Sequence, residues 1–117
     1  MATESIMLLY GNADQVREID VVTVDGGSTP QTMTGWALTF VVRLGDVLML
    51  SKTTVSGITI GNGSGTDDRA TIDIEDTDTE SWTPGQRYRW ALWRSDTGNE
   101  TPLAHGRLAI IDVAALP

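Results

Sequence analysis

The chain has 117 residues, which is the size of one domain and long enough to bury a hydrophobic core without covalent cross-links. It contains no cysteine, which excludes disulfide bonds and thiolate metal sites. Eight basic and sixteen acidic residues give a net charge of −8, and this charge makes nucleic acid and anionic membrane surfaces poor partners. We therefore expect a single domain over residues 1–117.

The first third of the chain predicts two short strands joined by polar segments. Residues 6–10 form an apolar run, and residues 17–24 are rich in β-branched side chains, which favour strands. The sequence Asp25-Gly26-Gly27 is a strong turn signal. Residues 28–34 are polar, contain a proline and are predicted to be a connection.

Residues 36–44 show the clearest alternation of apolar and polar positions in the chain. A period of two over nine residues is typical of a half-buried strand. Gly45 and Asp46 interrupt the pattern, and residues 47–50 are predicted to return as a hairpin partner. The apolar face of this strand would consist of Trp36, Leu38, Phe40, Val42 and Leu44.

The middle of the chain predicts two further strands around a glycine-rich loop. Residues 58–60 form a short extended piece, residues 61–65 are too rich in glycine to hold regular structure, and residues 69–75 alternate again. Seven of the sixteen acids lie between residues 67 and 80. We interpret them as the solvated side of a strand and loop, with a rim that selects a basic partner or a cation as the alternative.

The last third predicts a strand of large side chains that lies in the middle of a sheet. After a turn at Pro84 and Gly85, the side chains of Tyr88, Trp90 and Leu92 share one face. Residues 96–99 favour a hairpin turn, and residues 105–112 a final strand. Residues 77–82 would form either a short helix or an irregular crossover between sheets.

Seven to eight short strands with turns between them predict an all-β fold, an antiparallel β-sandwich. The side of the aromatic strand opposite Tyr88 carries Arg87, Arg89 and Trp93. Trp93 either packs against a loop or is an exposed aromatic of the kind that interfaces favour. We therefore take Trp93, Arg89 and Arg87 as candidate interface residues.

Little in the chain resembles reaction chemistry. The single histidine, His105, has no serine or carboxylate at a spacing typical of a catalytic triad. Asp76, Asp78 and Glu80 offer oxygen ligands on alternate residues, but the glycine and distal glutamate of a helix-loop-helix calcium site are missing. We expect no enzyme activity, no metal and no cofactor.

The order of features from residue 15 onward, over about 95 residues, resembles a family of phage and prophage minor structural proteins, those with the N-terminal domain type of tail baseplate upper proteins. Pro84-Gly85-x-x-Tyr88 is also similar to the tyrosine corner of immunoglobulin-like sandwiches, which predicts a buried Tyr88 bonded to nearby backbone. The family resemblance rests on Met33-Thr34-Gly35 and the strand after it, Ile58-Thr59-Ile60, residues 70–74, Asp78-Thr79, Pro84-Gly85, residues 88–92, residues 96–98 and Gly106-Arg107-Leu108.

The resemblance implies an immunoglobulin-like, non-enzymatic component of a phage virion or prophage, which acts through protein–protein contacts in structure or assembly. Its partners would be other virion or assembly proteins, with a homo-oligomer through sheet edges as a further possibility. It would be located in the virion, or in the bacterial cytoplasm during assembly, since the start of the chain lacks the features of a signal peptide. The alternative is a carbohydrate- or host-surface-binding module in which Trp93 stacks on a sugar ring.

Overall fold

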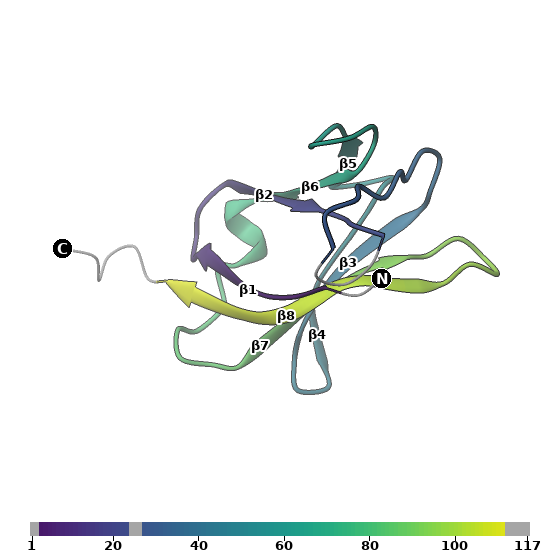
Figure 1. Ribbon diagram of the computed structural model, residues 1–117. Coiled ribbons are helices and arrows are strands. Elements are labelled where there is room, and N and C mark those ends of the chain that lie inside the picture. The colour runs from purple at the N-terminus through teal and green to yellow at the C-terminus, as the bar shows by residue number, and fades with distance from the viewer. Residues whose placement is uncertain (1–2, 24–26, 112–117) are drawn as a thin grey trace.

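Eight strands form two sheets that face each other across the molecule (Figure 1). This computed structural model describes residues 3–23 and 27–111. Within that part there is no α-helix, so the predicted all-β class with seven to eight strands is confirmed. The strands are β1 (Thr3–Tyr10), β2 (Gln15–Asp20), β3 (Leu38–Leu44), β4 (Val47–Thr53), β5 (Ile58–Gly61), β6 (Arg69–Ile74), β7 (Tyr88–Arg94) and β8 (Thr101–Ile111), with a 3-10 turn η1 (Asp76–Asp78) after β6.

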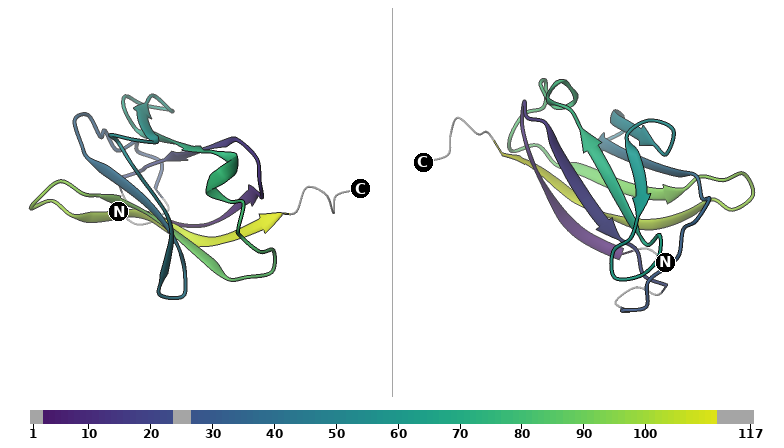
Figure 2. Two further views of the ribbon diagram at one scale, coloured as in Figure 1. Left: turned by 180° about the vertical axis from the view of Figure 1, so that it is seen from behind. Right: turned by 90° about the horizontal axis from the view of Figure 1, so that it is seen from above.

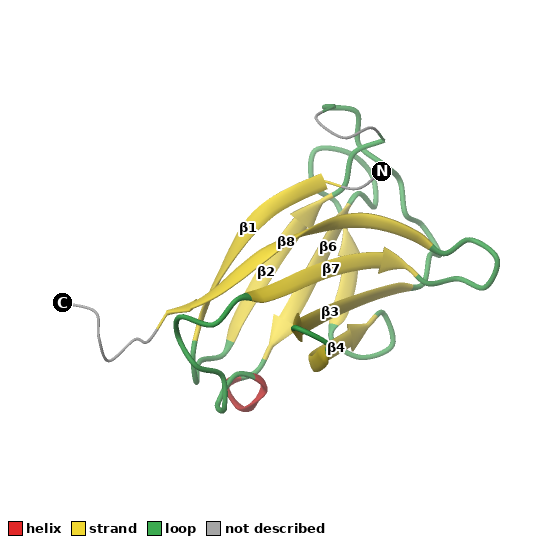
Figure 3. Ribbon diagram, turned by 90° about the horizontal axis from the view of Figure 1, so that it is seen from below, coloured by secondary structure: helices red, strands yellow, loops and turns green. Residues whose placement is uncertain are grey.

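The larger sheet has the order β1-β8-β7-β3-β4 and the smaller one the order β2-β6-β5. Figure 3 shows the larger sheet from its outer side, and the right-hand view of Figure 2 shows the smaller sheet in front. The prediction that the aromatic strand lies in the middle of a sheet is confirmed, because β7 has β8 on one side and β3 on the other.

The prediction of an antiparallel sandwich is wrong for one strand pair. β1 runs parallel to β8, while the other paired strands are antiparallel. β1 and β8 come from opposite ends of the chain, so no tight hairpin fixes their relative direction. Alternation within each sequence segment carries no signal of that direction.

The core lies between the sheets and contains the apolar faces that alternation predicts. From the larger sheet, the rings of Phe40 and Trp90 stack with their centroids 6.1 Å apart. From the smaller sheet, Ile72 and Ile74 of β6 are buried against them in one cluster. The two aromatic segments therefore meet in one apolar interior, as their period of two indicates.

Trp36 packs against the core, as the sequence predicts, but it precedes β3 and is not fully buried. The Trp36 N–H donates to the carbonyl of Met33 at 3.0 Å, which closes a turn through Gly35, and β3 begins only at Leu38. The ring is half-buried, and the guanidinium of Arg94 lies 4.0 Å from its centroid. The ring therefore packs against the core and also makes a cation–π contact with Arg94.

Other strand bounds differ from the predicted ones at their ends. β2 begins at residue 15 and ends at residue 20, and β8 begins at Thr101, because the hairpin ladder pairs Arg94 with Thr101. Val24, Asp25, Gly26 and Asp112, which the sequence places in strands or a turn, lie outside the described residues.

The crossover after β6 contains one helical turn and then irregular backbone, so both interpretations of residues 77–82 hold in part. The Asp78 carboxylate forms an ion pair of 2.7 Å with Lys52 of β4, and both side chains are largely buried. This contact ties the crossover to the larger sheet.

In the part of the chain that the structure describes, no helix is long and apolar enough to cross a membrane.

Candidate functional site

Three arginines lie side by side on the outer face of the larger sheet. Arg89 of β7 pairs with Arg43 of β3 on one side and with Arg107 of β8 on the other. All three side chains are exposed, and neighbouring strands are only about 4.8 Å apart. We call these residues the arginine row. Like charges directly opposite one another on neighbouring strands repel, so the row is unfavourable unless something neutralises it.

No carboxylate among the described side chains forms an ion pair with the arginine row. Elsewhere in the chain, Arg69 pairs with Glu18 and Asp20, and Arg94 pairs with Asp96. Arg17 is also engaged, because its guanidinium donates to the Leu8 carbonyl at 2.8 and 3.0 Å. The basic residues without such contacts are therefore concentrated on one surface.

Arg87 lines a hollow on the same face together with two residues of the arginine row. This hollow has a volume of about 530 Å³, and its lining includes Ile6, Arg87, Arg89 and Arg107. A smaller hollow of about 230 Å³ lies on the other side of Arg89 and is lined partly by Arg43 and the half-buried His105. We call the outer side of the larger sheet, with Arg43, Arg87, Arg89 and Arg107, the basic face.

Large apolar side chains surround the arginine row. Trp93 is 40% exposed, so of the two predicted placements the exposed one is confirmed. In the register of the sheet, Ile6 lies next to Arg107 and Leu48 lies next to Arg43. Ile6 and Leu48 are 72% and 50% exposed. The mixture of arginine, tryptophan and aliphatic residues is typical of the centre of a protein interface.

The candidate residues named from the sequence, Trp93, Arg89 and Arg87, thus lie on one face, and Arg43 and Arg107 were missed. Arg43 lies at an outward position of the predicted strand 36–44, and Arg107 lies in the predicted strand 105–112. The signal that was lacking is the register between strands, which decides whether such arginines are neighbours.

The outer side of the smaller sheet has the opposite charge. Glu18 and Asp20 of β2 and Asp73 of β6 point outward, and Glu75 follows directly after β6. We call this surface the acidic face. Arg69 offsets two of these carboxylates, which leaves Asp73 and Glu75 without a described cation.

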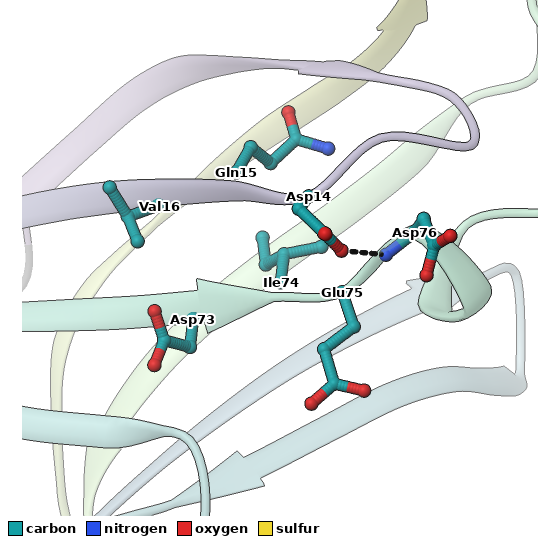
Figure 4. A pocket seen from close by; sticks show the side chains of 7 residues that line it. All are labelled: Asp14, Gln15, Val16, Asp73, Ile74, Glu75 and Asp76. Carbon is teal, nitrogen blue, oxygen red and sulfur yellow. Dashed lines mark hydrogen bonds between the residues drawn. The ribbon is translucent and has the colours of Figure 1, made fainter.

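A hollow of about 680 Å³ at the end of the acidic face is lined in part by Asp14, Asp73, Glu75 and Asp76 (Figure 4). Asp14 turns its carboxylate to the backbone N–H of Asp76, at 2.8 Å, while Asp73 and Glu75 extend away from it. Among the described residues, no group of three or more potential ligands is close enough to hold a metal ion. The acids form a charged surface rather than a coordination shell.

Asp68, one of the seven acids between residues 67 and 80, is buried rather than solvated. Its carboxylate accepts hydrogen bonds from the backbone N–H groups of Gly63, at 2.7 Å, and Gly65, at 3.2 Å. These bonds, led by the one from Gly63, lower the pKa of Asp68 below its usual value although burial opposes them. The glycine-rich loop, which the sequence predicts to lack regular structure, is therefore held around a carboxylate.

The edge of β1 next to β2 is partly blocked. Gln15 accepts a hydrogen bond from the Tyr10 N–H at 2.9 Å and donates one to the Tyr10 carbonyl at 2.7 Å, while Arg17 occupies the Leu8 carbonyl. Backbone groups satisfied by side chains cannot pair with an added strand. This end of β1 is a poor place for association through a sheet edge.

Tyr88 is buried, as predicted, and its hydroxyl oxygen accepts a hydrogen bond from the Thr83 N–H at 2.9 Å. The ring of Trp82 stacks on that of Tyr88 with centroids 5.1 Å apart. The crossover is thereby anchored at the start of β7, the strand that carries Arg89 and Trp93.

Comparison with known proteins adds no relative: no protein-family model matches the chain, and no curated protein matches it at a significant level.

Proposed function

We propose that this protein is a non-enzymatic structural or assembly component of a phage particle or prophage, and that it acts through protein contacts made by its basic face. The arginine row supports the choice of this face as the contact surface. In it, three exposed arginines lie next to one another without described acidic partners. The assignment to a phage particle rests on the resemblance of sequence features given above.

The proposal includes an immunoglobulin-like arrangement of the sandwich. Its support is the strand order, since β2-β6-β5 faces a sheet that contains β8-β7-β3-β4, as in variable-type immunoglobulin domains. The Tyr88 hydroxyl, bonded to the backbone just before its own strand, is a second point of support. Domains with this arrangement present one broad sheet face, which suits a docking role.

Interface chemistry favours a protein partner over a glycan. A guanidinium group binds a carboxylate through two parallel hydrogen bonds, in bidentate geometry. Because it is more weakly hydrated than an ammonium group, it is suited to ion pairs in interfaces. Trp93 beside Thr39 and Pro102 would add apolar contact at the margin of the face. A protein surface with carboxylates among apolar residues satisfies both kinds of group.

The test is incorporation into particles. Virions released by a host that encodes the chain would be purified on a density gradient and analysed by mass spectrometry, with the expectation that the chain bands with the particle. Complementation with Arg89→Glu/Trp93→Ala should lower incorporation at least about tenfold if these residues are interface hot spots.

The matched control is Val55→Ser, which removes an apolar side chain that is 95% exposed, in a turn outside the basic face. It should leave incorporation unchanged. Absence of the wild-type chain from particles would overturn the proposed function, and specific binding on a glycan array, lost in Trp93→Ala, would favour a carbohydrate-binding module instead.

A further inference from the structure

We infer that the occupant of the basic face is a second copy of this chain, docked through its acidic face, so that copies stack head to tail. This inference rests on the proposed function in taking the basic face as a protein-binding surface. It adds the identity of the partner and the geometry of the contact.

The first argument is charge complementarity within one chain. The basic face holds Arg43, Arg87, Arg89 and Arg107, and the acidic face and its adjoining hollow hold Asp14, Asp73, Glu75 and Asp76. The two surfaces belong to different sheets and lie on opposite sides of the molecule (Figure 1). Each copy therefore presents both halves of a complementary pair.

The second argument excludes the symmetric alternative. A two-fold dimer through the basic face would place one arginine row against another, and like charges in contact cost free energy. A two-fold dimer through the acidic face would do the same with Asp73 and Glu75. The contact that joins opposite charges is the heterologous one, which leaves a free face at each end and grows into an open stack.

The third argument is that apolar groups accompany the charges on both surfaces. Ile6 and Leu8 lie beside the arginine row, and Val16, 52% exposed, lies opposite Asp73 on the acidic face. Removal of these side chains from water favours contact, and it lowers the local dielectric around the ion pairs.

Net charge opposes the stack only at long range. Two chains of charge −8 repel each other, but ions screen this repulsion beyond about 8 Å at physiological salt, while the guanidinium–carboxylate pairs form at contact. The three-stranded sheet offers a narrow surface, so a single contact belongs to the small, weak class of interfaces. We expect association in the upper micromolar range, strengthened wherever several copies are held together.

The experiment uses two variants, each with one face reversed. Arg89→Glu/Arg107→Glu disables the basic face, and Asp73→Lys/Glu75→Lys disables the acidic face. By sedimentation velocity from about 10 μM to 1 mM, the wild type should form a series of oligomers that lengthens with concentration, and each variant alone should remain monomeric. A mixture of the two should recover association, because the intact acidic face of one variant is complementary to the intact basic face of the other, and the two reversed faces are of opposite charge as well.

The matched control is Glu80→Lys/Glu100→Lys, which changes the net charge as much as the acidic-face variant but at exposed positions in connecting loops. It should associate like the wild type. Thermal melts of all variants establish that they are folded.

A wild type that stays monomeric at 1 mM, or a mixture that forms no complex, would overturn the stack. Continued association of the Arg89→Glu/Arg107→Glu variant would assign self-association to the sheet edges instead. Either result leaves the particle-incorporation test untouched, and a stacking protein that is absent from particles would refute the proposed function alone.

Discussion

At the scale of single residues, Arg89 is the point where stability and binding conflict. It has an arginine on each neighbouring strand, and no described carboxylate pairs with it. We predict that Arg89→Gln raises the free energy of unfolding of the isolated chain by a few tenths of a kcal/mol at low salt, because the central like charge is removed. Denaturant titration at about 20 and 500 mM salt measures the gain, which should shrink as salt screens the row.

Arg94→Gln is the matched control for that measurement. Arg94 is on the same strand, but it forms an ion pair of 2.9 Å with Asp96 and lies over the ring of Trp36. Its replacement should lower stability. A loss of stability in Arg89→Gln as well would mean that the arginine row is not under repulsion.

Asp68 gives a prediction with a defined pH dependence. Its folded-state pKa is lowered, chiefly by the hydrogen bond from the Gly63 N–H, so its contribution to stability is present above the unfolded pKa of about 3.9 and is lost as pH falls through the folded value. Asp68→Asn should lower the melting midpoint at pH 7, and the difference from wild type should begin to narrow as pH falls below about 4. Thermal melts from pH 3 to 7 test this, and a difference that is constant over that range would contradict the assigned role of the charge.

At the scale of elements, the Tyr88 hydroxyl connects the crossover to β7. We predict that Tyr88→Phe lowers the free energy of unfolding by about 1 kcal/mol, because the part-buried hydrogen bond from the Thr83 N–H to the Tyr88 hydroxyl is lost. Tyr10→Phe is the matched control, since Tyr10 is 40% exposed and its hydroxyl has no hydrogen bond to another described residue. Equal melting midpoints for wild type and Tyr88→Phe would show that the hydrogen bond of the Tyr88 hydroxyl does not stabilise this fold.

The elements that could be predicted from the sequence are those whose own residues alternate. β3, β6 and β7 alternate between buried and outward side chains along most of their length, and their inner faces are the ones that the pattern indicates. The ends of elements depend on contacts between segments. Trp36, for example, lies in a turn before β3, and its ring contacts Arg94, 58 positions later in the chain.

The candidate site was predictable in its members on β7 but not in its extent. Trp93 and Arg89 alternate away from the buried face, which the sequence alone establishes. Whether they lie beside Arg43 and Arg107 depends on strand order and register, because β3 and β8 flank β7 on its two sides. For the same reason, the parallel pairing of β1 with β8 could not be predicted from either segment.

At the scale of the whole molecule, the separation of charge between two faces makes the isolated chain sensitive to salt. The acidic face carries four carboxylates with Arg69 as their described cation, and the basic face carries four guanidinium groups without a described carboxylate partner, so like charges repel on each surface. The ion pairs that salt would weaken include Lys52–Asp78 and Arg94–Asp96, and these are partly buried and therefore less screened.

We therefore predict that salt stabilises this protein. Raising NaCl from about 20 to 200 mM should raise the melting midpoint by about 2–5 °C, measured at a chain concentration low enough to exclude association. Asp73→Asn/Glu75→Gln should melt higher than wild type at low salt and respond less to added salt, because the repulsion within its acidic face is already reduced. A melting midpoint that falls with added salt would mean that attraction within ion pairs outweighs repulsion within the two charged faces. The charges of these faces would then be neutralised by contacts within the chain rather than by a partner.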